Sequence, residues 1–320
     1  MQKNIKYWLI AAILLIGIGG IGFTAVMAEF DWNFSKLSSA KYETSEYILQ
    51  ESFQNISIKT NTADIAFIPT DNDNPSVSCY ELENMWHKVS VKDGTLVIEV
   101  VDTREWYEYI GIFSDKPKIT LHIPQGEYSA LAITCQTGDI TLPKELGFQS
   151  MDISNHTGDV TIRSSIENTA DIKATTGSIC VEQITAGTLK LSVSTGKITA
   201  SDVICQDTVT VKVSTGKTHL TNIQCQSLIS TGDTGDIHLK NVVAAETFSI
   251  KRDTGDVKFD SCDAPSISVE TDTGDVTGSL KTEKVFLTET DTGRIDVPKS
   301  TAGGTCEIRT DTGDILIKIG

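Results

Sequence analysis

The stretch Ile267-Ser-Val-Glu-Thr-Asp-Thr-Gly-Asp-Val276 decides the fold of this chain, because variants of it return at nearly constant spacing. Its glycine belongs to a series of ten Thr-Gly pairs, whose successive glycines are 19 or 20 residues apart. The glycines of the series are Gly138, Gly158, Gly177, Gly196, Gly216, Gly235, Gly255, Gly274, Gly293 and Gly313. A fixed period of this length is typical of one supersecondary unit per repeat, stacked on its neighbours.

Aliphatic residues recur at fixed distances from these glycines. They occupy the seventh and fifth positions before the glycine and the second and fourth positions after it, with mostly polar residues between. Alternation with period two on both sides of a glycine indicates two strands joined by a turn. The sequence therefore predicts an all-β fold, a single-stranded parallel β-solenoid of about ten coils of 19–20 residues, preceded by one transmembrane helix. A two-layer sandwich is the alternative, but it would not need so strict a period.

The composition indicates the type of core and excludes some classes of partner and site. Hydrophobic residues make up 39% of the 320 residues but aromatic residues only 7%, which fits a core of Val, Ile and Leu. The formal net charge of −16 repels polyanions, so no nucleic-acid partner is expected. The seven cysteines are widely spaced and include no C-x-x-C pair, which is typical of small buried side chains rather than a zinc site or a disulfide framework.

The N-terminal segment predicts a membrane anchor. Residues 7–28 carry no charge and match one helical crossing of the lipid bilayer. Lys3 and Lys6 precede the segment and Glu29 follows it, so residues 29–320 are expected to be extracytoplasmic at the cell membrane, with the N-terminus inside. Cleavage after Ala28, as in a signal peptide, is the competing interpretation, and it would release a secreted protein.

Five segments follow from these patterns. Gly17-Ile-Gly-Gly-Ile-Gly22 formally matches a dinucleotide-binding motif, but no βαβ unit surrounds it, so these are interpreted as membrane-helix glycines. Ile56 to Phe67 repeats the unit with Ala63 in the glycine position. The expected segments are a cytoplasmic tail (1–6), a transmembrane helix (7–28), a linker (29–44), an irregular first coil and cap (45–130) and the solenoid (131–320).

The repeat resembles a bacterial β-strand-repeat family known as "putative adhesins", a domain of unknown function. The resemblance covers roughly residues 45–320 and rests on cores such as that of Ile267 to Val276, together with the short N-terminal membrane segment. It implies a cell-envelope protein, in some members linked to envelope-stress systems, and it carries over no catalytic residues.

Aspartates at the turns of the last repeats are candidate Ca²⁺ ligands. They are Asp233, Asp236, Asp253, Asp256, Asp272, Asp275, Asp311 and Asp314. Stacked carboxylates repel one another, and a divalent cation with oxygen ligands would relieve the repulsion. The alternative is that Asp suits turns and keeps the rod soluble, since no calcium-loop consensus is present and Lys197, Lys217 and Arg294 interrupt the series.

An aromatic stretch within the cap is the candidate contact for a partner. Its members are Trp106, Tyr107, Tyr109 and Phe113. Exposed aromatic residues are enriched at binding surfaces, and the alternative is a hydrophobic lid over the first coil. The chain ends on Asp314-Ile-Leu-Ile-Lys-Ile-Gly320 without a polar cap, so we expect the C-terminal coil to leave a strand edge for self-association or a partner.

No catalytic motif emerges. The acidic residues repeat with the period, so no pair of carboxylates stands apart, as glycoside hydrolysis would require. The sequence predicts a non-enzymatic, adhesin-like surface module without a required cofactor, which contacts an envelope polymer or a surface protein. An envelope-stress sensor or accessory protein is the alternative, and a polysaccharide-acting β-helix enzyme a distant one.

Overall fold

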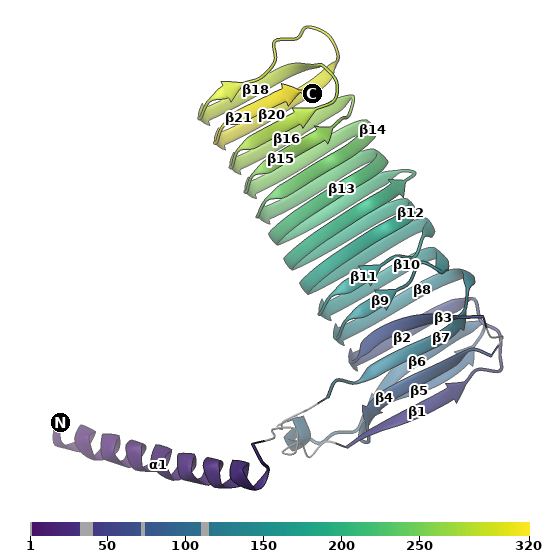
Figure 1. Cartoon of the computed structure of the whole chain (residues 1–320), viewed down its shortest axis with the longest axis vertical. Helices are drawn as coiled ribbons and strands as arrows, with labels where there is room; N and C mark the ends of the chain where they lie inside the picture. The colour runs from purple at the N-terminus through teal and green to yellow at the C-terminus, as the bar shows by residue number, and fades with distance from the viewer. Residues whose placement is uncertain (1, 33–40, 72–73, 110–114) are drawn as a thin grey trace.

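A computed structural model describes residues 2–32, 41–71, 74–109 and 115–320. Helix α1 (Gln2–Glu29) is followed by a long rod of stacked coils, which ends at the distal tip far from the helix (Figure 1). Neighbouring coils pair in parallel and in register, so the predicted β-solenoid is confirmed.

Two faces of the rod carry the paired strands. One face holds the strands that lead into the glycine turn: β2 (Asn55–Thr62), β8 (Gly126–Thr137), β10 (Leu146–Thr157), β16 (Ser266–Thr273), β18 (Lys284–Thr292) and β20 (Gly304–Thr312). The other holds the strands that leave it: β3 (Asp64–Thr70), β9 (Ile140–Leu142), β11 (Val160–Ile162), β15 (Val257–Cys262), β17 (Val276–Leu280), β19 (Ile295–Asp296) and β21 (Ile315–Ile319). In the middle of the rod, three strands run on around the corners: β12 (Ile166–Cys205), β13 (Thr208–Thr234) and β14 (Ile237–Thr254).

The core consists of the aliphatic columns that the sequence predicts. Ile267 lies opposite Cys306 and Val276 opposite Ile315, and all four side chains are buried. Burial of a Val, Leu or Ile side chain stabilises the fold by about 1.5–3 kcal/mol, so a column repeated through every coil supplies most of the driving force. Thr218 is an exception in its column, because its hydroxyl is buried there without a hydrogen-bond partner.

The glycine corner is the closest contact between coils. Gly255 has a φ of 149°, and a Cβ atom added there would lie 2.2 Å from the carbonyl oxygen of Gly235. A Cβ atom added at Gly274 or Gly313 would collide in the same way with the glycine carbonyl oxygen of an adjacent coil. Only glycine allows both the positive φ and this approach of two backbones.

The off-period Gly232 has a packing role. It lies opposite Arg252 of the next coil. The Arg252 side chain points into the core and is only 2% exposed, although it is a charged residue type. The guanidinium donates to Ser230 Oγ at 2.8 Å and to the Lys251 carbonyl oxygen at 3.1 Å. A Cβ atom on residue 232 would lie 2.6 Å from Arg252 Nη1, so the glycine leaves the space that the guanidinium fills.

The order of coils departs from the order of the sequence at the distal end. Strand β20 pairs with β16 on one side and with β18 on the other, and β21 likewise pairs with both β17 and β19. The C-terminal coil is therefore the second-last coil of the rod. The expectation that this coil leaves a free strand edge is wrong, because β18 and β19 cover it. Ile295 of β19, an inward position in other coils, is accordingly 43% exposed.

The order of strands also departs from the order of the sequence at the proximal end, where residues before the solenoid form the cap. Strands β6 (Thr95–Asp102) and β7 (Lys118–Pro124) pair in parallel with β2 and β3, outside them. Antiparallel strands then extend both faces: β5 (Met85–Lys92) pairs with β6, while β4 (Ser76–Leu82) pairs with β7 and with β1 (Tyr42–Ile48). The cap thus consists of two short antiparallel layers that continue the two faces of the rod.

Substitution of Gly255 by Ala tests the glycine corner. We expect a loss of about 3 kcal/mol in the free energy of unfolding, because the methyl group forces the neighbouring backbone apart and the φ is strained. Gly94→Asn is the matched control, since Gly94 also has a positive φ but no atom lies within 4 Å of its Cβ position. Equal effects of the two substitutions in chemical denaturation would contradict the close contact between coils.

Substitution of Thr218 by Val should stabilise the rod. Valine keeps the shape of threonine and removes the unpaired buried hydroxyl, so we expect a gain of about 1 kcal/mol. The exposed outward-facing residue Thr141 provides the control, Thr141→Val. A destabilised Thr218→Val protein would show that the hydroxyl has a partner in solution.

Candidate functional site

The predicted calcium ligands form two rows along one edge of the rod, on either side of the glycines. In the row that follows the glycine, the aspartate carboxylates accept hydrogen bonds from backbone N–H groups of the neighbouring coil. Asp139, Asp256 and Asp275 each donate an amide N–H to the aspartate carboxylate of the preceding coil, at 2.9, 3.3 and 2.9 Å. Asp314 continues the row with a bond of 2.7 Å to Asp275. These carboxylates thus tie coil to coil, which is a structural role that the sequence did not reveal.

The middle coils show why lysine is tolerated in this row. Lys197 and Lys217 occupy the position after the glycine, and there the strands run through the corner with Gly196 opposite Gly216. The backbone ladder itself pairs the coils at this point, so no carboxylate is required. Lys217 also forms an ion pair of 3.2 Å with Asp236 of the next coil.

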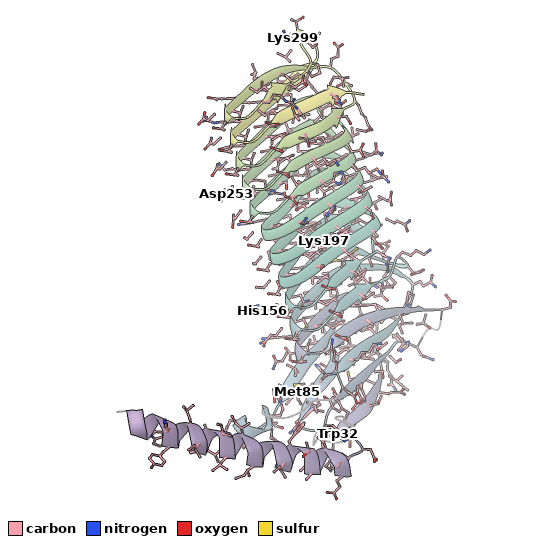
Figure 2. All side chains as sticks on the ribbon, turned by 60° about the vertical axis from the view of Figure 1, so that its left-hand side comes forward. Trp32, Met85, His156, Lys197, Asp253 and Lys299 are labelled. Carbon is pink, nitrogen blue, oxygen red and sulfur yellow. The ribbon has the colours of Figure 1, made fainter. Side chains whose placement is uncertain are left out.

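The row before the glycine differs, because its side chains are exposed. In spatial order along the distal half of the rod it contains Asp233, Asp253, Asp272, Asp311 and Asp291. Figure 2 shows Asp253 at this edge of the rod, pointing outward. The structure therefore brings the predicted acidic residues together, and it separates them into one row bonded to amides and one row facing solvent.

The predicted aromatic contact is only partly described. Trp106, Tyr107 and Tyr109 lie in the short 3-10 helix η2 (Trp106–Tyr109) beside the cap. The Trp106 side chain is 75% exposed, whereas the side chains of Tyr107 and Tyr109 are not described and Phe113 lies outside the described residues.

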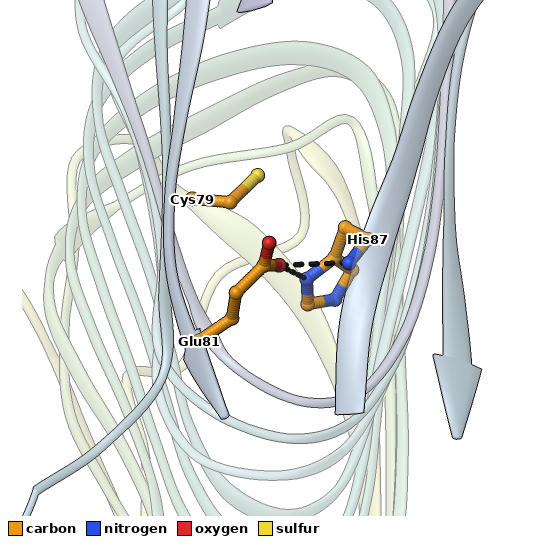
Figure 3. A group of neighbouring side chains, drawn as sticks. All are labelled: Cys79, Glu81 and His87. Atoms are coloured by element: carbon orange, nitrogen blue, oxygen red, sulfur yellow. Dashed lines mark hydrogen bonds and ion pairs between the residues drawn. The ribbon is translucent and has the colours of Figure 1, made fainter. Parts of the chain in front are cut away.

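A cluster of three titratable side chains lies buried inside the cap. Cys79 and Glu81 project from β4, and His87 projects toward them from β5, the next strand in the chain, which lies in the opposite layer of the cap (Figure 3). Each of the three residues is at most 2% exposed, and one candidate ligand atom from each lies within 4.8 Å of the other two. These residue types are all ligands for transition metals.

Hydrogen bonds fix the carboxylate and the imidazole. Glu81 Oε2 accepts from the backbone N–H of His87 at 2.7 Å and lies 2.9 Å from His87 Nδ1. The other ring nitrogen, Nε2, lies 2.8 Å from the hydroxyl oxygen of Thr60 on β2. Tyr47 on β1 donates its hydroxyl to the carbonyl oxygen of His87 at 3.0 Å. The cluster therefore links strands of both layers of the cap.

The thiol of this cluster is not a nucleophile. Burial, and second the charge of Glu81, raise the pKa of Cys79 to about 12, so at neutral pH almost no thiolate forms. Burial also raises the pKa of Cys135 to about 11 and those of Cys225 and Cys306 to about 12. A Cys-His-Glu set in this setting can bind a cation or hold the cap together, but it does not attack a substrate.

Sequence reasoning missed the cluster because it lies where the repeat is absent. The available signal was the alternation in Val77, Cys79 and Glu81, which places a carboxylate on the inward face of a strand. A buried Glu demands a partner, and His87 is the inward residue of the following strand that provides it.

Comparison with known sequences identifies the family. The sequence profile of the Toastrack DUF4097 family matches residues 53–207 and, in a second overlapping match, residues 197–320. The chain belongs to the Toastrack DUF4097 family. The two matches together include the cap cluster as well as the solenoid, so both are parts of the Toastrack region of this protein. No curated protein matches the chain.

Several solved structures are similar over most of this Toastrack chain. A "putative adhesin" of Bacteroides fragilis has 15% identity and a TM-score of 0.41, covering 87% of this chain and 97% of its own. A "putative lipid binding protein" of Parabacteroides distasonis has 14% identity, a TM-score of 0.47, and coverage of 88% and 98%. A "putative adhesin" of Parabacteroides merdae has 12% identity and a TM-score of 0.45, covering 88% of this chain and 98% of its own. Likenesses this distant say nothing about ligand or activity.

Thiol labelling tests the burial of the cysteines. All seven are free; six are buried and Cys180 is half-buried. Burial also raises the pKa of Cys180, so we expect the native Toastrack protein to react slowly with a maleimide at pH 8, at Cys180 first, and all seven thiols to react after denaturation. Rapid labelling of Cys79 in the native protein, located by mass spectrometry, would contradict the structure.

Proposed function

We propose that this Toastrack protein is a non-enzymatic surface module, held at the cell membrane by its N-terminal helix, which contacts an envelope polymer or a surface protein through the sides of its rod. The observation that carries the proposal is the combination of an exposed apolar helix with a rigid rod whose outer faces repeat the same side-chain pattern. Such a surface offers many equivalent weak contacts, and these add up through effective concentration.

The anchor is supported by the composition of α1. Its segment Lys6–Glu29 has 24 residues with a mean hydropathy of 2.4, and almost all of its side chains are exposed, Met27 being the buried exception. Basic residues precede the apolar run and acidic residues follow it, which favours an extracytoplasmic rod in a single-pass topology. A cleaved signal sequence meets the same criteria of length and apolar composition, and it would place the rod on the same side of the membrane.

The absence of enzymatic activity is supported by the chemistry of the two candidate sites. The exposed aspartates of the distal edge share one environment, so no member is distinguished as a general acid. The cap cluster lies within the core and holds its thiol protonated. Neither arrangement combines an activated group with access for a substrate.

The exposed acidic row is the part of the rod that we assign to the contact. Strands of the same face lie about 4.8 Å apart, so its carboxylates repel one another along the edge. Ca²⁺ shared between this row and an anionic envelope polymer would relieve the repulsion and bridge the two surfaces. Calcium is thus proposed as a bridging ion at Asp233, Asp253, Asp272 and Asp311, rather than as a cofactor.

Co-sedimentation of the full-length protein in lipid nanodiscs with bacterial envelope fragments tests the proposal. We expect retention in the presence of Ca²⁺ and roughly tenfold weaker retention in chelator, equivalent to about 1.4 kcal/mol. The triple variant Asp253→Asn, Asp272→Asn, Asp311→Asn should bind equally weakly under both conditions.

The control removes the same charge elsewhere, with Glu145→Gln, Asp152→Asn and Glu167→Gln, all exposed residues of the proximal half. It should behave like the natural sequence. A protein that fails to sediment under either condition would contradict the surface-module proposal. Retention that is equal with Ca²⁺ and chelator would contradict only the bridging ion.

A further inference from the structure

We propose that Cys79, Glu81 and His87 form a Zn²⁺ site inside the cap. The proposal is independent of the function proposed above, because it concerns the interior of the cap and not the outer faces of the rod. It assigns the buried cluster to a borderline-soft divalent cation, for which thiolate, imidazole and carboxylate are the usual protein ligands.

The spacing of the ligand atoms supports zinc. Bonds of about 2.0–2.3 Å in tetrahedral geometry place ligand atoms roughly 3.3–3.8 Å apart. The three candidate atoms already lie within 4.8 Å of one another, on two strands that follow each other in the chain and face each other across the interior of the cap. Glu81 Oε2 and His87 Nδ1, now 2.9 Å apart, need to separate by only about half an ångström to admit the ion. Small side-chain rotations therefore suffice, without movement of the strands.

The surrounding hydrogen bonds are those that a zinc site requires. A metal-binding histidine usually donates its second ring N–H to an oxygen, which orients the ring and fixes the tautomer. Thr60 Oγ1 lies 2.8 Å from Nε2 and can accept that proton, so that Nδ1 faces the ion. The carboxylate of Glu81 is oriented by the backbone N–H of His87. Two of the three ligands are thus held in place before any ion binds.

The charges balance when zinc enters. The ion displaces the thiol proton of Cys79, which leaves to solvent, and His87 binds the ion through Nδ1 as a neutral imidazole whose one N–H is on Nε2. One thiolate and one carboxylate then neutralise the two positive charges of Zn²⁺ within the buried cluster. A neutral assembly is the form that a water-excluding core tolerates, since isolated buried charges are costly. The three side chains supply three ligands, and a bound water completes the usual four.

Burial determines how the ion would be loaded. Because each ligand residue is at most 2% exposed, zinc must enter before the two layers of the cap, one containing β4 and the other β5, close on each other. The ion would then join Cys79 and Glu81 of β4 to His87 of β5, close to the contact of His87 with Thr60 on β2. Zinc acts in this arrangement as a structural clamp on the proximal end of the rod.

Refolding the full-length protein in detergent, after unfolding in chelator, tests the site. Protein refolded with Zn²⁺ should retain one ion per chain after gel filtration, measured by elemental analysis, and should melt at a higher temperature than protein refolded in chelator. Refolding with Co²⁺ should give a thiolate-to-cobalt charge-transfer band in the near ultraviolet. That band reports directly on a Cys ligand and is independent of stability.

Two variants locate the ion. Cys79→Ser should abolish the charge-transfer band and His87→Gln should lower the retained metal at least tenfold, whereas Cys306→Ser, which replaces another buried cysteine, should preserve both signals. If Cys79→Ser fails to fold, the Co²⁺ spectrum of the natural sequence and of Cys306→Ser decides the question. A refolded natural protein that retains no metal, or whose Co²⁺ spectrum lacks the thiolate band, overturns the proposal.

Discussion

The contact between glycine corners is the constraint on which the rest of this structure depends. At each corner the backbone of one coil approaches the carbonyl oxygen of the next so closely that no Cβ atom fits. This contact restricts each coil to 19 or 20 residues, and the one-residue difference is absorbed away from the corner, as at the register shift between Cys225 and Ser227. The aliphatic columns, the in-register pairing and the aspartate ladder all follow from corners that coincide along one edge.

Aspartate at the corner illustrates how one residue type serves two purposes. In the row after the glycine, the carboxylate accepts an amide N–H of the neighbouring coil, where the strand ladder is interrupted by the turn. Where the ladder continues through the corner, at Gly196 and Gly216, lysine replaces aspartate without loss of pairing. The row before the glycine has no such constraint and faces solvent. The charge of the rod is therefore partly a consequence of how its turns are built.

Much of the fold could be predicted from the sequence, because the period places chemically similar residues in contact. The recurring glycines and aliphatic residues predicted both the solenoid and its core, and the uncharged run of residues 7–28 predicted the N-terminal helix. The inverted coil order could not be predicted, because the repeats at Gly293 and Gly313 carry the same columns and fit either position. The cap cluster was missed for the opposite reason, since Cys79, Glu81 and His87 belong to no repeat and meet only because β4 and β5 face each other across the interior of the cap.

The inverted order at the distal end has a consequence for how the protein is made. Synthesis delivers the chain from the N-terminus, so residues 284–296 emerge before the segment that must lie beneath them. The outermost coil cannot take its final place until residues 304–319 have arrived and inserted as strands β20 and β21. A chain without residues 304–319 would leave the strand edges of β16 and β17 without the partners that β20 and β21 provide.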